Sequence, residues 1–535
     1  MPAIIPRRAR PVKIDSAFGT GLLRALHSGG GGAIKTAVMS SPSKPRFIVY
    51  FIGLTAALAG LLFGLDIGVI SGAQLYIQKD FGIDDRMIEF IVSALLWGAV
   101  AGALFSGFAS NKFGRRRTLL FSAVLFAAGS IVCALAPSPG FLVAARFVLG
   151  IAVGVASFTA PLYLAEIAPQ SVRGALISMY QLMITIGILL AFLSDTFFSS
   201  RADANVAEQA VEGAKFTTMW FDSYVQGLAD AGHGVGVWRW MLGIICLPAI
   251  LMFLGVLFLP ESPRWLFLNG LHDHAKAVFK RLHLDDAEIA SEMREIQDSL
   301  KVEQKGLPLF LQNSHFRRAV FLGIGLQIIQ QLTGINVIMY YAPRIFGMAG
   351  FESTTEQMWA TVIVGITNVL ATFIAIAFVD RLGRKPIMYA GFVVMGASLL
   401  TVGGIFHAMG GGESGAPSPL AYPAAFALLL FIVGFAMSAG PIIWVICSEI
   451  YPLAGRDFGI TCSTGTNWIA NAIVGMTFLT LVNGIGPGNT FLMYGALNVV
   501  FIVAFLLFVP ETKGVSLEKI EANLLSGKPL RRIGK

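Results

Sequence analysis

Residues 47–71 read FIVYFIGLTAALAGLLFGLDIGVIS. The run is long enough to cross the hydrocarbon core of a bilayer, which requires about 20 predominantly apolar residues in a helix. Its one formal charge is Asp66, and a carboxylate at that depth is costly, so such residues are functional candidates. The stretch therefore predicts a membrane-spanning helix that carries a functional acid.

Further apolar runs of similar length follow along the chain. The 535 residues are 55% hydrophobic and 13% charged, and the mean hydropathy is +0.72, whereas soluble domains are about 25% charged. We therefore predict an all-α membrane protein of twelve transmembrane helices. The other runs cover 88–108, 117–137, 141–163, 174–195, 238–259, 318–341, 358–379, 386–408, 421–447, 461–482 and 490–509.

The basic residues predict the orientation of these helices. The side that carries both termini has 32 Lys and Arg, and the opposite side has 6. By the positive-inside rule, both termini are predicted to be cytoplasmic. Because topology explains the net charge of +8, we expect no nucleic-acid partner.

The chain divides into five expected parts. They are 1–46, a cytoplasmic and disordered segment; 47–260, an amino-terminal six-helix bundle; 261–317, a cytoplasmic linker with short helices; 318–510, a carboxy-terminal six-helix bundle; and 511–535, a cytoplasmic tail. Residues 196–237 are expected to form a solvated external loop. Met39 begins a shorter lead into the first span, so we expect translation to start there.

Three motifs occur once in each half of the chain, at corresponding places. This duplication predicts two parallel repeats of six helices, an arrangement found in carriers that bind substrate near the bilayer midplane between the halves. The pairs are Asn111–Arg117 with Asp380–Lys385, Glu166 and Arg173 with Glu449 and Arg456, and Pro260–Ser262 with Pro510–Thr512.

These loops also contain complementary charges that could form a cytoplasmic clasp. The carboxylates and guanidiniums would pair when the carrier faces outward and separate when it faces inward. Because each exposed pair contributes at most about 1 kcal/mol, the clasp would bias the equilibrium without locking it. The expected gating residues here are Arg115, Glu166, Arg173, Arg384, Glu449 and Arg456.

Arg146 is the expected countercharge of Asp66 within the amino-terminal half. Since arginine stays protonated, Asp66 must be the group that titrates. Burial favours the neutral acid and the guanidinium favours the carboxylate, so a movement of Arg146 or the entry of water would switch proton binding. A permanent structural ion pair remains the alternative.

The loop motifs resemble those of the sugar porter family of the major facilitator superfamily. The strings Pro260-Glu-Ser-Pro-Arg-Trp265, Gln330-Gln-Leu-Thr-Gly-Ile-Asn336 and Pro510-Glu-Thr-Lys-Gly514 carry the resemblance. Strings at Gly60–Asp66, Met179–Gly187 and Asp457–Ser463 are similar to the bacterial galactose and arabinose proton symporters. The resemblance covers about residues 47–525. It implies the major facilitator fold and import of a hexose or pentose with a proton, by alternating access across a bacterial inner membrane.

Neutral amides suit a sugar, because its hydroxyls both donate and accept hydrogen bonds. Span 318–341 supplies Gln327, Gln330, Gln331 and Asn336. On an unbroken helix Asn336 would lie opposite Gln327, whereas unwinding at Gly334 would turn all four toward one cavity, as in the discontinuous helices of carriers. The alternative is that these amides only hold helices together.

The resemblance implies further substrate contacts, which lie in other spans. Tyr340 and Tyr341 are expected to form an external gate, and Gly440-Pro441 is expected to break the helix just before Trp444. One departure is Asn111, where the superfamily often has Asp, which weakens that half of the clasp. The implied contacts are Phe63, Gln181, Asn368, Trp444 and Asn471.

Two other functions remain open at this stage. A facilitator would move sugar without protons, and Asp66 argues against it; a transporter-like sugar sensor would need longer cytoplasmic segments.

We expect no enzyme, cofactor or metal site, because the sequence has no metal-ligand cluster, phosphate loop or nucleophile paired with a base. The four cysteines are scattered and expected to pack. We expect the protein, with monosaccharide and proton as co-substrates in the bilayer, to function as a monomer.

Overall fold

Helical segments of membrane length make up most of the described part of the chain. The computed structural model describes residues 47–168, 173–203, 236–282, 286–301, 306–410 and 419–535. The chain divides into units 1–44 and 45–535, and all described residues belong to the second. In these ranges, twelve segments are long and apolar enough to span a membrane. The predicted number of spans and the all-helical fold class are therefore confirmed.

The first six spans form one helical bundle. Glycines allow its helices to approach closely: a Cβ on Gly64 of α2 would lie 2.0 Å from the carbonyl oxygen of Ile184, and one on Gly98 of α3 would lie 2.0 Å from that of Phe147. Small residues at such crossings are typical of membrane helices. The helices are α2 (Phe47–Phe81), α3 (Asp85–Phe113), α4 (Arg115–Ala134), α5 (Pro139–Ile167), α6 (Arg173–Asp203), α9 (Val237–Gly243) and α10 (Cys246–Leu257).

The last six spans form a second bundle, in which two spans are divided. The break in the seventh span falls between α15 and α16, and that in the tenth falls between α19 and α20. The helices are α15 (Ser314–Leu332), α16 (Ile335–Met348), α17 (Thr354–Leu382), α18 (Arg384–Ala408), α19 (Ala421–Met437), α20 (Ala439–Ile450), α21 (Arg456–Ile485) and α22 (Pro487–Phe508).

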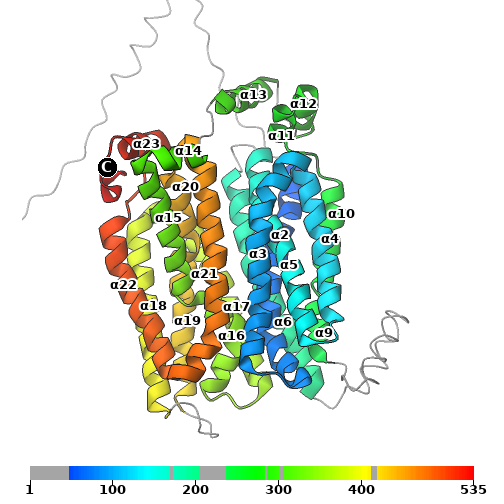
Figure 1. Cartoon of the computed structure of the whole chain (residues 1–535), viewed down its shortest axis with the longest axis vertical. Coiled ribbons are helices and arrows are strands. Elements are labelled where there is room, and N and C mark those ends of the chain that lie inside the picture. The colour runs from blue at the N-terminus through cyan, green and yellow to red at the C-terminus, as the bar shows by residue number, and fades with distance from the viewer. Residues whose placement is uncertain (1–46, 169–172, 204–235, 283–285, 302–305, 411–418) are drawn as a thin grey trace, which may run out of the picture. The chain divides into compact units, whose positions relative to one another are not determined.

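Short helices lie at one end of the bundles, here called the tail end; the opposite end, where α2 and α3 meet, is called the loop end (Figure 1). The linker between the bundles forms four of these helices, and the carboxy-terminal tail forms α23 and the 3₁₀ helix η3. They are α11 (Pro263–Leu268), α12 (His272–Arg281), α13 (Asp286–Lys301), α14 (Gly306–Gln312), α23 (Leu517–Leu525) and η3 (Leu530–Arg532), and η2 (Leu453–Gly455) precedes α21.

Two boundaries differ from the sequence-based expectation. Helix α6 continues to Asp203, past the expected loop start at 196, because the chain there still packs against α2: the Tyr76 hydroxyl and the Ser199 hydroxyl lie 2.6 Å apart. The tenth span breaks at Ser438, with φ −127° and ψ −89°, so Pro441 lies in the first turn of α20, where proline is tolerated. The expectations for 1–46, Met39 and 204–235 fall outside the described residues.

Candidate functional site

The seventh span is discontinuous at the predicted residue. Gly334 separates α15 from α16 and has a left-handed φ of +97°, a conformation that glycine adopts without steric cost. The unwinding considered for this span is therefore present in the structure. It places Asn336 on the other side of the break from the three glutamines of α15, and the expectation that all four amides face one cavity stays a prediction.

The four predicted amides form two hydrogen-bonded groups. The Asn467 amide donates to the side-chain oxygens of Gln327 at 2.7 Å and Gln330 at 2.8 Å. The Gln330 amide in turn donates to the carbonyl oxygen of Ala439 at 2.8 Å, where α20 begins. Separately, Asn336 donates to the side chain of Gln331 across the helix break. The three glutamines are all buried. The hydrogen bonds of Asn467 and Gln330 join α15, α20 and α21.

Asn467 was missed by the sequence analysis. It lies on α21 four residues before Asn471, and residues at i and i+4 share one face of a helix. Two amides on one face of an apolar span were the signal that could have found it. In the structure Asn467 links Gln327 and Gln330, which makes it a central member of the amide network.

Both tyrosines of the expected gate are buried and bonded to α21. The Tyr340 hydroxyl donates to Oδ1 of Asn471 at 3.1 Å, and the Tyr341 hydroxyl donates to the carbonyl oxygen of Gly475 at 2.8 Å. On the same helix, α21, the ring of Trp468 packs against that of Phe63 on α2, with centroids 5.2 Å apart. Aromatic faces from both bundles therefore meet beside the buried amides.

The other substrate contacts that the resemblance implies are Gln181, Asn368 and Trp444. Gln181 is half-buried and Asn368 is buried, but among described residues neither side chain hydrogen bonds with the amide network. Trp444 is 37% exposed on α20. Their roles as substrate contacts stay predictions.

Asp66 is enclosed in the first bundle and has no hydrogen-bond partner among the described residues. It is 1% exposed, and neither carboxylate oxygen has a donor among the described groups. Arg146 is also 1% exposed and directs its Nε to the carbonyl oxygen of Ile91 at 2.8 Å, yet its charge still acts on Asp66. Both charges also act on the hydroxyl of Tyr340. Among the described residues, therefore, no hydrogen bond or ion pair joins Asp66 to Arg146.

Two further carboxyl groups are buried at membrane depth. Asp195 on α6 accepts a hydrogen bond from the Gly72 N–H at 3.1 Å. Glu89 on α3 accepts from the backbone N–H of Thr480 at 2.8 Å and from its hydroxyl at 2.5 Å. The sequence analysis did not single them out, although each is an acid within an apolar run.

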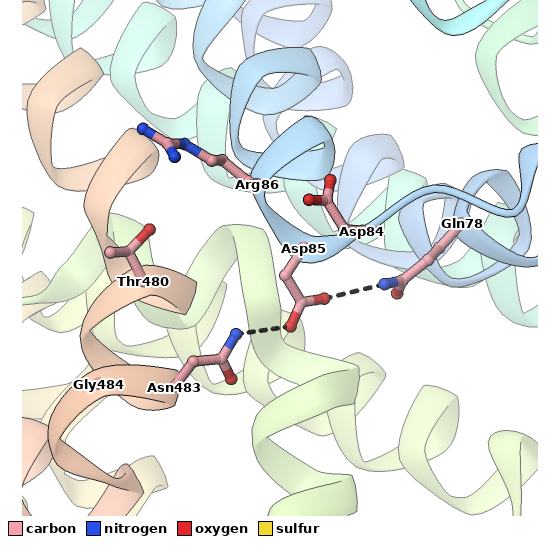
Figure 2. A pocket seen from close by; sticks show the side chains of 7 residues that line it. All are labelled: Gln78, Asp84, Asp85, Arg86, Thr480, Asn483 and Gly484. Atoms are coloured by element: carbon pink, nitrogen blue, oxygen red, sulfur yellow. Dashed lines mark hydrogen bonds between the residues drawn. The ribbon is translucent and has the colours of Figure 1, made fainter.

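A network of polar side chains connects the two bundles at the loop end. Asp85, at the start of α3, accepts hydrogen bonds from Gln78 at 2.9 Å and Asn483 at 3.0 Å (Figure 2), and it pairs with Arg344 at 2.6 Å. Gln78, Asp85 and Asn483 border a cleft of 570 Å³. Hydrogen bonds that join the two bundles between described residues all lie at this end, where Gln74 also reaches the carbonyl oxygen of Tyr340.

The tail end contains the same network twice, once in each bundle. Arg115 forms a two-point ion pair with Glu166 at 2.8 Å, and Ser262 donates to the same carboxylate at 2.5 Å. In the second bundle, Arg384 pairs with Glu449 at 2.9 Å and Thr512 donates to it at 2.5 Å. The predicted duplication thus reappears as matched geometry.

The glycines before these arginines match as well. Gly114 and Gly383 both have φ of +95°. In the first bundle Glu261 accepts from the backbone N–H of Arg115, and in the second Glu511 accepts from that of Arg384. These ion pairs lie within each bundle rather than between the bundles. They are formed while the loop end is closed, so they do not act in this structure as the expected clasp, which was to separate when the carrier faces inward. Arg456 donates to the carbonyl oxygen of Tyr451, and the side chain of Arg173 is outside the described residues.

The fold and this site define a membrane transport protein built from two six-helix repeats. The chain belongs to the Sugar (and other) transporter family, whose pattern matches residues 52–524. Because this is a family of transporters, the expectation that the chain is not an enzyme is confirmed. The resemblance found in the sequence is confirmed with it.

Individual relatives are similar over almost the whole chain. The galactose-proton symporter of Escherichia coli K12 is 55% identical over 490 residues, covering 91% of this chain and 97% of its own length. The arabinose-proton symporter of the same strain is 49% identical over 484 residues, covering 90% and 95%. An inward open structure of the xylose transporter XylE from E. coli superposes with a TM-score of 0.72 at 30% identity, covering 89% and 99%.

Proposed function

We propose that this protein is a monosaccharide–proton symporter that imports a hexose such as galactose or glucose, or a pentose. The observation that carries the proposal is the position of Asp66, a buried carboxyl group without a hydrogen-bond donor beside the charge of Arg146. An ionised carboxylate there has no bonded partner to offset its burial. Such a group is suited to bind and release a proton as its surroundings change. The relatives named as galactose and arabinose proton symporters support the same assignment.

Proton binding would be linked to sugar binding through Tyr340. Its hydroxyl donates to Asn471, its backbone carbonyl accepts from Gln74 of the other bundle, and the charges of Asp66 and Arg146 act on it. Neutralisation of Asp66 would remove its negative charge from the neighbourhood of Arg146 and change the electric field at Tyr340. The amide network on α15 and α21 would then receive the sugar hydroxyls.

The orientation follows from the distribution of basic residues. With the tail end in the cytoplasm of a bacterium and the loop end outside, the network around Asp85 closes the external side. Opening of this network and closure of the tail end would give alternating access. Each chain has its own amide network and its own Asp66, so a monomer is the proposed functional unit.

One proton provides enough free energy for useful accumulation. A membrane potential of 100 mV corresponds to about 2.3 kcal/mol per charge, which sustains roughly fifty-fold accumulation of a neutral sugar, since 1.4 kcal/mol is a factor of ten.

The test is to reconstitute the protein in liposomes and follow external pH as galactose, glucose, xylose and arabinose are added in turn. Alkalinisation with at least one sugar supports symport and identifies the substrate. Entry of radiolabelled sugar without a pH change would instead identify a facilitator. Absence of both sugar entry and pH change for all four sugars would argue against the proposal, provided that the same preparation binds none of them.

A further inference from the structure

A cleft at the tail end lies between the seventh and twelfth spans, outside the amide network and both ion-pair networks. It has a volume of 350 Å³ and is bordered by α15, α22 and η3. Its lining includes Phe321, Gly325, Ile329, Phe508 and Leu530, with Arg318 at one end. The volume lies within the range of about 300 to 1,000 Å³ typical of small-molecule sites.

The cleft opens toward the bilayer. Phe321 is 61% exposed and Phe508 is 56% exposed, and both lie on helices that span the membrane. Arg318 and Ile329 are eleven positions apart on α15, which corresponds to about 16 Å at 1.5 Å per residue. Since the hydrocarbon core is about 30 Å thick, the cleft occupies the depth of one leaflet. An acyl chain is therefore the ligand that this surface and its surroundings fit.

One arginine lines the cleft, and two more follow a lining residue in the chain. Arg318 is exposed, and Arg531 and Arg532 directly follow the lining residue Leu530 and are exposed too. In the described part of the chain, none of the three forms an ion pair. The carboxylate of Glu511 accepts hydrogen bonds from the backbone N–H groups of Lys385 and Lys513 at 2.9 and 3.0 Å, and it forms no ion pair with these arginines in the described part of the chain.

We propose that this cleft binds one anionic phospholipid, with an acyl chain between α15 and α22 and its phosphate at Arg318 and the η3 arginines. Guanidinium groups bind phosphate oxygens in a two-point geometry, and basic pockets between membrane helices are suited to anionic head groups. The site does not depend on the identity of the transported sugar. A zwitterionic lipid would gain the apolar contacts but would carry no net charge for these arginines.

Two variants test the head-group and acyl-chain parts separately. Arg318→Ala removes the charge at an exposed position, and Gly325→Leu fills the cleft, because a Cβ at Gly325 meets nothing within 4 Å. Arg117→Ala removes a charge at another exposed position, in the first turn of α4. Gly107→Leu adds the same bulk at another open glycine, on α3. The second pair serves as matched controls.

The measurement is native mass spectrometry of the purified full chain with equal amounts of phosphatidylglycerol and phosphatidylcholine. The wild type is expected to retain one phosphatidylglycerol in preference to phosphatidylcholine. Arg318→Ala should reduce this preference about fivefold, since each basic residue contributes about 1 kcal/mol, and Gly325→Leu should reduce retention of the lipid itself. Both controls should bind as the wild type does. Equal retention of the two lipids by the wild type, or equal losses in the control variants, would overturn the proposal.

Discussion

The hydroxyl of Tyr340 donates a hydrogen bond to Oδ1 of Asn471 at 3.1 Å, although the two residues are 131 positions apart. The backbone carbonyl of Tyr340 accepts from Gln74 in the other bundle at 2.6 Å. The charges of Asp66 and Arg146 act on the same tyrosine. Tyr340 therefore connects the amide network to the closed loop end, and we expect the charge of the proposed proton site to act on it.

Tyr340→Phe removes this hydroxyl and leaves the buried Asn471 oxygen without its donor. Such a loss costs about 1 to 3 kcal/mol, so we expect the affinity for the transported sugar to fall at least about fivefold. Isothermal titration calorimetry at pH 6 and pH 8 should also show a weaker pH dependence of binding than in the wild type. Tyr50→Phe, at a 53% exposed position, is the control. Wild-type affinity and pH dependence in Tyr340→Phe would exclude the proposed link.

Gln330→Ala removes a side chain that bonds both to Asn467 and to the start of α20. We expect sugar affinity to fall by about 1 to 3 kcal/mol. Asn467→Ala should have a similar effect, and the double variant should lose less than the sum, because the two residues share one network. Equilibrium binding to the three variants tests this. Full additivity, or unchanged affinity in Gln330→Ala, would remove the network from the sugar site.

Much of the fold was predictable because the bilayer imposes strict requirements on sequence. Runs of about 20 apolar residues are needed to span it, and these revealed the twelve helices. The duplicated motifs also predicted the duplicated geometry, since Glu166 and Glu449 occupy equivalent positions in matched networks. The break at Gly334 could be suggested from the sequence because Asn336 would otherwise lie opposite Gln327 on an unbroken helix.

Other features depend on packing between distant segments. Nothing local to Asn467 indicates that its amide reaches both Gln327 and Gln330. Likewise, the contact between Asp85 and Arg344 joins residues 259 positions apart. The tenth span breaks at Ser438 rather than at Gly440-Pro441, because proline fits the first turn of a helix as readily as it ends one. Tertiary contacts, rather than local pattern, determine these positions.

Asp85→Ala should weaken closure of the loop end. The ion pair with Arg344 is partly exposed, with side-chain exposures of 13% and 30%, so its loss costs about 1 kcal/mol. That shifts the ratio of outward-open to inward-open molecules about fivefold. Distances between spin labels on the loop ends of α3 and α21 measure this shift.

Arg86→Ala is the control for this experiment, because Arg86 borders the same cleft (Figure 2) and is exposed. It should leave the distance distribution unchanged. An unchanged distribution in Asp85→Ala would show that this network does not hold the external side closed.

Acidification should weaken the tail-end network of the second bundle. Burial raises the pKa of Glu511, but hydrogen bonds from the backbone N–H groups of Lys385, Lys513 and Arg384 outweigh burial and leave the pKa below its usual value. A lowered folded-state pKa means that the stabilisation is present above the usual carboxyl pKa and is lost as pH falls through the lowered one. The thermal midpoint should therefore fall less between pH 6 and pH 3 in Glu511→Gln than in the wild type. Parallel curves for the two proteins would contradict this assignment.

The most direct test of the account is Asp66→Asn in proteoliposomes, measured as sugar accumulation driven by a proton gradient and as exchange of labelled for unlabelled sugar. The amide cannot carry the transported proton but has nearly the same size and can fill the same space. We predict that accumulation is lost while exchange continues and sugar binding is retained. Accumulation at the wild-type level in Asp66→Asn would show that another group, such as Asp195 or Glu89, couples proton movement to sugar transport.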